Sequence, residues 1–507
     1  MGKNRYLSFQ RLLNFIEKAG NALPHPATLF LIFALLALVI SLIGYLANWR
    51  VIHPGTGEVI VVKNLLSVEG LHYILITTVS NFTGFAPLGI VLVAMLGIGI
   101  AESSGLIGAV IRVFILSAPR SILTFVLVFA GVLSNIAADV GYVLLIPLAG
   151  IIFIAVGRHP IIGMAAAFAG VSGGFSANIV LGTIDPLLAG LSEEAARIID
   201  PSYTVNPTAN YYFMFVSTFV IAIVGTLITE KIIAPRMTNY IPQDGVIHDK
   251  FERLSGQEKK GLLNAGLVFT VFVIILLIGL IPSEGFLRGK SGTILSSPAL
   301  KGVVTLLFII AGVMGIVYGI TIRKYRNDSD VMKGMAESMK SMATYIVLVF
   351  FAAQFVAYFK ESNLGIVAAV KGADLLKAAN LNIYVLMFLF IIFAAFINML
   401  MGSASAKWAI MAPVFIPVFM LLGYSPELSQ VVYRIGDSVT NVISPMMSFF
   451  ALIIAFFQKY DKNAGIGTVV SVMIPYSIAF FIVWTLLLMG WIKIGLPLGP
   501  GAGLYYG

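Results

Sequence analysis

Uncharged, mostly apolar stretches recur along the whole of this 507-residue chain. Each is about 17–25 residues long, which is the length that an α-helix needs to cross the roughly 30 Å hydrocarbon core of a bilayer. Hydrophobic residues make up 59% of the chain and charged residues 11%, whereas soluble domains are about a quarter charged. A transmembrane β-barrel would alternate polar and apolar residues with a period of two, and we find no such pattern. The sequence therefore predicts an all-α polytopic membrane protein, with the lipid bilayer as its main partner.

The charged residues lie mainly in the links between these stretches and limit the function classes. Lys and Arg exceed Asp and Glu by nine, but they occupy short loops, where they orient a membrane protein, so nucleic-acid binding is not expected. The chain has no cysteine, no zinc-binding histidine spacing and no P-loop, so we expect no resident cofactor and no ATP motor. Residues 1–26 are basic without a cleavage site and are expected to be a cytoplasmic leader.

Loop charge predicts that one apolar tract turns back inside the membrane. Arg120 and Arg158 flank the tract 121–157, and both links have the basic character of cytoplasmic loops. A tract with both ends on one side of the membrane must be a re-entrant hairpin. The polar sequence SNIAAD (134–139) supplies its turn.

A second tract, 381–424, is also too long for one ordinary membrane helix. Its middle, NMLMGSASAKWAIMAPVF (398–415), holds Gly402, small residues and Lys407, and we expect a second hairpin turn there. Each hairpin is followed by an asparagine-containing segment that we expect to break a helix: GFSANIV (174–180) and DSVTNVI (437–443).

The resulting plan is a single transporter domain with nine transmembrane helices and two re-entrant hairpins. The expected cytoplasmic loops, 231–260 and 323–340, carry six and five basic residues, and the expected outer loops, 48–85 and 191–210, carry two and one. This bias puts the amino terminus inside and the carboxyl terminus outside. Five crossings separate the hairpins, so they enter from opposite sides, as in an inverted repeat. The hairpins with their broken helices are expected within 117–190 and 381–457.

The polar turns are candidates for a binding site near the membrane midplane. Irregular backbone at that depth persists only where it faces protein or water. Free carbonyls and carboxylates there suit Na⁺, and the amino termini of half-helices suit an anion. The alternative is that Gly, Ala and Ser only permit close helix packing.

A charge at the centre of a membrane helix costs about 2.5–3.5 kcal/mol on insertion scales, so charged residues inside or beside predicted crossings are notable. They are Asp139, Asp185, Lys407, Arg434 and Asp437. Arg434 and Asp437 are three apart and share a helix face. Either they neutralise each other, or Arg434 binds a substrate carboxylate while Asp437 holds a cation or proton. Asp185 precedes a proline and either caps a helix break or takes part in function. Asp139 and Lys407 are open between structural and functional roles, and snorkelling is one option for Lys407.

Uncharged polar and aromatic residues of the same segments also have two interpretations. Trp408 either packs the core or stacks on an aromatic ligand. Asn398, Asn441 and Asn178 either ligate a cation through their amide oxygens or bond across helices.

The sequence resembles the p-aminobenzoyl-glutamate transporter (AbgT) family, including members that export sulfonamides and folate-pathway antimetabolites. The resemblance covers nearly the whole chain and is strongest in INMLMGSASAKWAIMAPV, SPELSQVVYRIGDSVTNVISPMM and SGGFSANIVLGTIDPL. It implies a homodimer with nine membrane helices and two opposed hairpins per subunit, each subunit with its own transport path. It implies a substrate path through Asp185, Ser405, Trp408, Pro426, Arg434, Asp437 and Pro445. It implies a Na⁺ site formed by Asn398, Gly402, Asp437 and Asn441.

We therefore expect a secondary active transporter in a bacterial cytoplasmic membrane. Its substrate would be p-aminobenzoyl-glutamate or a related aryl carboxylate or sulfonamide, moved by alternating access and coupled to H⁺ or Na⁺. Asp185 and Asp437 are the expected proton carriers, because a low-dielectric path raises a carboxyl pKa. Ion gradients set the direction, so uptake and export both fit.

Two rival functions belong to other classes. A membrane channel also contains re-entrant loops. An intramembrane hydrolase would need Ser405 beside Lys407 as a nucleophile and base, although residues two apart on a helix point to different faces.

Overall fold

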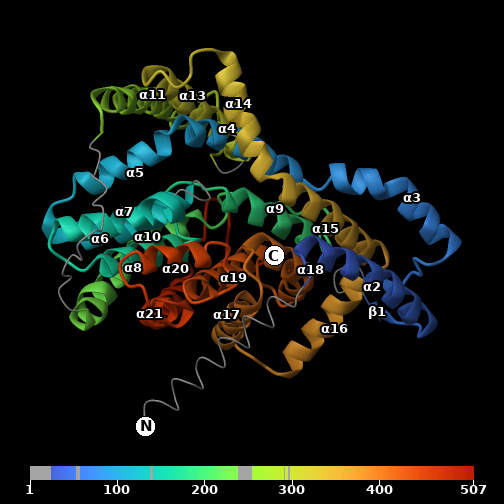
Figure 1. The fold of residues 1–507 in the computed structure, drawn as a ribbon. Helices are drawn as coiled ribbons and strands as arrows, with labels where there is room; N and C mark the ends of the chain where they lie inside the picture. Colours follow the sequence, from blue (N-terminus) through green and yellow to red (C-terminus); the bar gives the residue numbers. More distant parts are fainter. Residues whose placement is uncertain (1–23, 53–56, 137–140, 238–253, 290–291, 295–296) are drawn as a thin grey trace, which may run out of the picture.

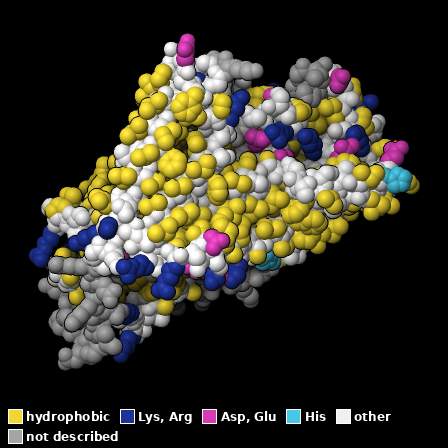
Figure 2. Space-filling view, turned by 90° about the horizontal axis from the view of Figure 1, so that it is seen from above, with side chains coloured by type: hydrophobic (Ala, Val, Ile, Leu, Met, Phe, Trp, Pro, Cys, Tyr) yellow, Lys and Arg dark blue, Asp and Glu magenta, His cyan; other side chains and the backbone are white. Residues whose placement is uncertain are grey.

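The computed structural model describes residues 24–52, 57–136, 141–237, 254–289, 292–294 and 297–507. Helices dominate these ranges, and the two strands found within them, β1 (Arg50–Ile52) and β2 (Val59–Val61), form one antiparallel pair. Hydrophobic side chains cover much of the face seen in Figure 2. Ile76 and Leu263, for example, are 78% and 72% exposed, as side chains that face lipid should be.

Two groups of helices carry no hairpin (Figure 1). The first group lies at the top of Figure 1 and packs around α4: α4 (Ala86–Ser104), α5 (Leu106–Leu116), α11 (Gly256–Leu280), α12 (Pro298–Lys301), α13 (Val303–Thr321) and α14 (Asp328–Ser341). The second group packs around α15: α2 (Pro26–Leu46), α3 (Val68–Thr83), α15 (Ala343–Glu361) and α16 (Leu364–Ala378). Helix α3 lies within the segment 48–85 that the sequence predicts as a loop. Ser67 caps it by accepting a hydrogen bond from the Gly70 amide.

The first hairpin occupies the predicted tract. Its arms are α6 (Leu123–Leu133), with the 3₁₀ turn η2 (Ser134–Ile136), and α7 (Ile146–Ala155), preceded by the π turn η3 (Gly141–Leu145). Arg158 Nη1 lies 3.3 Å from Thr124 Oγ1, so the two ends of the tract meet. Asp139, at the expected turn, lies outside the described residues.

A broken helix follows this hairpin. It consists of α8 (Pro160–Phe168), the π turn η4 (Ala169–Gly173), an irregular segment 174–183 and α9 (Ile184–Ala196). We call the irregular segment 174–183 the first break.

The second half repeats this order. Helices α17 (Ile383–Leu400) and α18 (Ala404–Leu421) form the second hairpin, followed by α19 (Pro426–Asn441), an irregular segment 442–449 and α20 (Phe450–Gln458). The arms are antiparallel, because the Phe390 ring lies 4.7 Å from that of Phe415 and 5.0 Å from that of Phe419. We call the irregular segment 442–449 the second break. The last helix is α21 (Ile466–Ile494).

Helix α10 shows that the hairpins enter from opposite sides. It spans Tyr211–Ile228 and continues as η5 (Thr229–Ile233) and η6 (Ala234–Arg236). At its start, Asn210 Nδ2 donates to Glu427 O, 3.0 Å away, at the base of the second hairpin. At its other end, Glu230 Oε1 lies 2.9 Å from Arg158 Nη1, at the base of the first.

The expected fold class is confirmed. Nine helices in the described ranges are long and apolar enough to cross a membrane, and the segment from α5 to α6 is bent by 111°. The helices that make up these nine differ from the predicted nine crossings in one respect. Two of the nine, α17 and α18, are arms of a hairpin, while two predicted crossings are the broken helices. The first broken helix runs from the base of the first hairpin to the base of the second, since Tyr203 beyond α9 donates to Glu427 at 2.9 Å.

Candidate functional site

The tip of each hairpin packs against the break of the helix that follows it. A Cβ on Gly402, in the second turn, would lie 1.9 Å from Met446 O. A Cβ on Gly182, in the first break, would lie 2.9 Å from Asn135 O, at the tip of the first hairpin. Both positions therefore need glycine, because the facing main chain leaves no room for a side chain.

An asparagine amide makes the same contact in both halves. Asn135 Nδ2 donates to Val171 O at 3.1 Å, and Asn398 Nδ2 donates to Asp437 O at 2.6 Å. Each amide fixes a hairpin tip to a carbonyl of the adjoining broken helix, as expected where membrane backbone is irregular.

The two broken helices touch each other at the centre of the molecule. The Ser176 amide donates to Ser438 Oγ at 3.2 Å, and Arg434 Nη2 donates to Ser176 O at 2.7 Å. The first break and α19 therefore form one polar centre, although 258 residues separate Ser176 from Arg434.

The first buried ion pair of this centre joins Arg434 to Asp185. Arg434 Nη2 lies 2.7 Å from Asp185 Oδ1, and the two side chains are 1% and 9% exposed. Asp185 Oδ2 also accepts a 2.7 Å hydrogen bond from the Gly182 amide, so Asp185 caps the first break. Arg434 Nε is buried and has no hydrogen-bond partner among the described residues.

The second buried ion pair joins Lys407 to Asp437. Lys407 Nζ lies 2.6 Å from Asp437 Oδ1 and also contacts Asn398 Oδ1. Asn398 in turn donates to Thr440 Oγ1 and Asn441 Oδ1, both 2.9 Å away. Asp437 Oδ2 is buried without a hydrogen-bond partner among the described residues.

The structure contradicts two of the predictions for these charges, the Arg434–Asp437 pair and the snorkelling of Lys407. Arg434 and Asp437 do not pair with each other in the described structure, because each has a closer partner on another helix. Lys407 does not snorkel to an interface, since its side chain is 0% exposed.

Trp408 packs the core in this conformation. Its ring stacks on Tyr433 with centroids 4.5 Å apart and planes 24° apart, and Nε1 donates to Ser192 Oγ at 2.9 Å. The Tyr433 hydroxyl donates to Ala404 O at 2.5 Å, which holds the start of α18 against α19. One face of the indole is thus covered, and a ligand would reach it only after a rearrangement.

The remaining expected site residues lie in two places, near the second hairpin turn and at the start of α19. Ser405, 3.2 Å from Ser403 Oγ, and Pro445 are partly exposed near the second turn and second break. Pro426 starts α19 and lies eight residues before Arg434, about 12 Å away along the helix. Pro426 is therefore not part of the charged centre.

The sequence did not single out four residues that complete this centre: Ser176, Ser192, Tyr433 and Thr440. Ser176 and Thr440 lie in the two segments expected to break helices, so their position was a usable signal. Ser192 and Tyr433 carry no such signal, because only the packing of α9, α18 and α19 brings them to Trp408.

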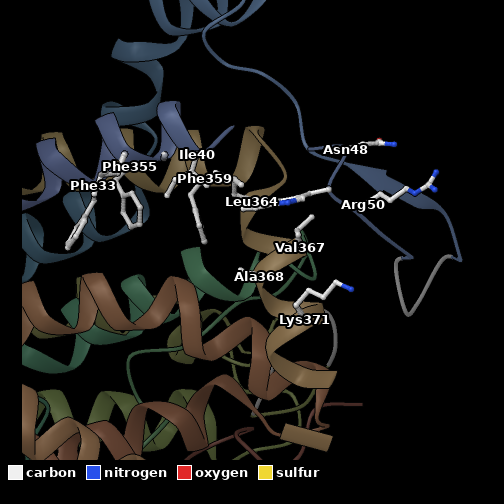
Figure 3. Close-up of a pocket in the computed structure, with 13 residues that line it drawn as sticks. Phe33, Ile40, Asn48, Arg50, Phe355, Phe359, Leu364, Val367, Ala368 and Lys371 are labelled. Carbon is white, nitrogen blue, oxygen red and sulfur yellow. The ribbon is translucent and has the colours of Figure 1, made fainter. Parts of the chain in front are cut away.

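The charged centre is separate from a large apolar cavity shown in Figure 3. This cavity of about 680 Å³ lies between α2, α15 and α16 and is lined by Phe33, Phe355 and Phe359, with Arg50 and Lys371 toward its other end. None of the expected site residues lines it. The ion pairs are therefore enclosed by protein rather than open to this cavity.

One buried atom of each ion pair lacks a hydrogen-bond partner among the described residues, and these two atoms indicate what the centre could bind. Arg434 Nε is a donor and suits an anionic acceptor, whereas Asp437 Oδ2 is an acceptor and suits a proton or a cation. A buried polar group left without a partner costs about 1–3 kcal/mol. A ligand that satisfied these atoms would recover that free energy.

Comparison with known proteins gives consistent matches. A family model described as "AbgT putative transporter family" matches residues 11–506. The p-aminobenzoyl-glutamate transport protein of Escherichia coli (strain K12) is 39% identical over 492 residues, which cover 97% of this chain and 96% of that protein.

Two solved structures match almost completely. The YdaH transporter of Alcanivorax borkumensis, described as having an unusual topology, has a TM-score of 0.90 and 46% identity, covering 94% of this chain and 100% of its own. MtrF of Neisseria gonorrhoeae, described as illuminating a class of antimetabolite efflux pumps, has a TM-score of 0.92 and 49% identity, covering 97% and 100%.

Proposed function

The chain belongs to the AbgT transporter family, and we propose that it is a secondary active transporter of p-aminobenzoyl-glutamate or a related aryl compound. The proposed substrate class includes sulfonamide-type antimetabolites, and the similarity to MtrF, described as illuminating a class of antimetabolite efflux pumps, supports antimetabolites in general. One observation carries the proposal. Two opposed hairpins and two broken helices meet at a buried centre that holds two ion pairs. Such a centre at the interface of inverted repeats is where secondary transporters bind their cargo.

Arg434 is the proposed anchor for the anionic part of the substrate. Its guanidinium already binds one carboxylate, that of Asp185, and Nε remains without a partner. A substrate carboxylate or sulfonyl group would take the planar donor fork and release Asp185. Trp408 is the proposed stacking surface for the aryl ring once Tyr433 has moved away from it.

Asp185 and Asp437 are the proposed proton carriers. Each neutralises a buried cation, so protonation of either carboxylate would release its partner. Coupling to Na⁺ through Asn398, Gly402, Asp437 and Asn441 fits less well. The Lys407 ammonium lies against both Asn398 and Asp437, and Asn441 Oδ1 accepts from the Asn398 amide. The described geometry therefore favours H⁺ over Na⁺.

The proposed mechanism is alternating access. The hairpin-bearing helices would move against the group around α4, which contacts them where α4 packs on α9 and α5 packs on α6. We place two such subunits in a homodimer in a bacterial cytoplasmic membrane, with the amino terminus inside and the carboxyl terminus outside.

Flux of radiolabelled p-aminobenzoyl-glutamate in proteoliposomes tests this proposal. The pH and Na⁺ gradients should be imposed separately on wild type, Arg434→Ala, Trp408→Ala, Asp185→Asn and Asp437→Asn. We expect saturable flux driven by the pH gradient in wild type and a loss of at least about tenfold in each variant, a loss of roughly 1.4 kcal/mol. Flux that does not saturate would favour a channel, and wild-type flux in both aspartate variants would exclude them as proton carriers. The folded yield of each variant must match wild type.

The hydrolase alternative receives no support from the geometry. Ser405 Oγ contacts Ser403, whereas Lys407 is bound to Asp437 and Asn398, so the described residues form no Ser–Lys dyad. Incubation of the purified protein with p-aminobenzoyl-glutamate should leave the amide bond intact.

A further inference from the structure

The four buried charges of the polar centre balance one another. Arg434 and Lys407 supply two positive charges, and Asp185 and Asp437 supply two negative ones. A further buried carboxylate, Glu427, lies at the base of α19 against the Tyr203 hydroxyl and away from this centre. The centre therefore offers no excess negative charge to a metal cation, and a bare cation in a low-dielectric site needs one.

The Lys407 ammonium takes the oxygens that a cation would need. It lies 2.6 Å from Asp437 Oδ1 and contacts Asn398 Oδ1, and both oxygens belong to residues expected to ligate Na⁺. A Na⁺ ion bound to both oxygens would share them with Nζ and would lie next to the ammonium. Like charges so close together repel strongly in a dry site.

The fold itself positions the ammonium there. Lys407 lies in the first turn of α18, directly after the second hairpin turn. The Tyr433 hydroxyl fixes the start of that helix by its bond to Ala404 O, and the Lys407 side chain is 0% exposed. The ammonium is thus held by packing as well as by charge.

We propose that the Lys407 ammonium is the resident cation of this site, in the place that Na⁺ would take, and that it excludes Na⁺ from the Asn398 and Asp437 oxygens. Removal of the lysine charge would leave the Asp437 carboxylate uncompensated beside amide oxygens, and the site would then accept Na⁺. The proposal concerns binding alone, so it stands or falls independently of the transport activity proposed above.

Binding of ²²Na⁺ to the purified protein in detergent tests the inference, with thermal unfolding in NaCl and in KCl as a second readout. The relevant quantity is the Na⁺ binding that disappears in Asp437→Asn. Wild type should show none and should unfold at the same temperature in both salts. Lys407→Met should bind Na⁺ saturably and should unfold about 3 °C or more higher in NaCl than in KCl.

Two control variants separate charge from packing. Lys407→Arg retains the positive charge and should bind no Na⁺. Lys407→Met combined with Asp437→Asn lacks both charges and should fold without binding Na⁺. If Lys407→Met folds only when Na⁺ is present, that result also supports the inference.

Three results would overturn it. The first is Asp437-dependent Na⁺ binding by wild type, because the lysine would then not exclude the ion. The second is a folded Lys407→Met protein that binds no Na⁺. The third is a Lys407→Met protein that fails to fold even in NaCl, because Na⁺ would then be unable to replace the ammonium.

Discussion

Replacement of Asp185 by asparagine would leave the Arg434 guanidinium buried without a counter-charge. The two side chains are 9% and 1% exposed, so water cannot compensate for the lost carboxylate. Breaking such a pair from one side costs about 3–5 kcal/mol. Asparagine can still accept the Gly182 hydrogen bond that Asp185 now accepts at 2.7 Å, so we expect the lower end, about 3 kcal/mol.

The matched double variant separates structure from transport. In Asp185→Asn with Arg434→Met, neither charge remains, and replacement of both members of a buried pair is often neutral or stabilising. Its stability should therefore return to near that of wild type, while substrate flux stays lost. Asp374→Asn, at an exposed aspartate that forms no ion pair with any described residue, should change neither.

Thermal unfolding in detergent, followed by tryptophan fluorescence, measures these differences. Unfolding entropy scales at about 2 cal/mol/K per residue, so a chain of 507 residues loses about 1 °C of Tm per kcal/mol. Asp185→Asn should then unfold about 3 °C below wild type. A single variant as stable as wild type, or a double variant as unstable as the single one, would refute this role of the ion pair.

Three further predictions address the hairpins and the broken helices. Gly402→Ala should lower both Tm and flux, because its Cβ would lie 1.9 Å from a main-chain oxygen of the second break. Gly490→Ala has open space around its Cβ and should behave as wild type. Equal behaviour of the two variants would contradict this packing. In unfolding assays, Trp408→Phe should lower the free energy of unfolding by about 1 kcal/mol, because the hydrogen bond to Ser192 is lost, and Trp408→Ala should lower it by about 3–5 kcal/mol. Equal losses in the two variants would show that the stacking on Tyr433 is unimportant. The neutral Nδ1 of His159 caps α8, and burial lowers the pKa of this imidazole. The stability that the cap contributes is therefore present above the unfolded pKa of about 6.5 and is lost as the pH falls toward the folded pKa. His159→Asn should reduce the drop in Tm between pH 7.5 and 5.5, and an unchanged drop would refute the cap's role.

Loop charge was the property that made the hairpins predictable. Arg120 and Arg158 bracket a tract of double length, and their shared side of the membrane forces a turn between them. The structure brings Arg158 to within 3.3 Å of Thr124 at the start of that tract. The prediction succeeded because a charged side chain is costly to bury in lipid regardless of tertiary detail.

Partner choice within the site was not predictable in the same way. Helical periodicity put Arg434 and Asp437 on one face of α19, which made them candidates for a pair. The structure instead gives each a partner from a different helix, Asp185 on α9 and Lys407 on α18. Sequence spacing indicates contacts within one helix. These ion pairs depend instead on how α9, α18 and α19 pack, and the local sequence of α19 does not specify that packing.

Helix boundaries inside the apolar tracts were similarly hidden. The uncharged core predicted over 160–184 ends as a regular α-helix at Phe168 and passes through a π turn before the first break. Gly, Ala and Ser in this segment suit close packing and irregular backbone equally well. Only the facing hairpin tip decides between these two uses.

Helix α10 has a mechanical consequence for how the site can change. Glu230 ties one of its ends to the base of the first hairpin, and Asn210 ties the other end to the base of the second. A continuous helix resists stretching, so it works as a strut between the two bases. A displacement of one hairpin would then act on the other through α10, and we expect the two hairpins to move across the bilayer together.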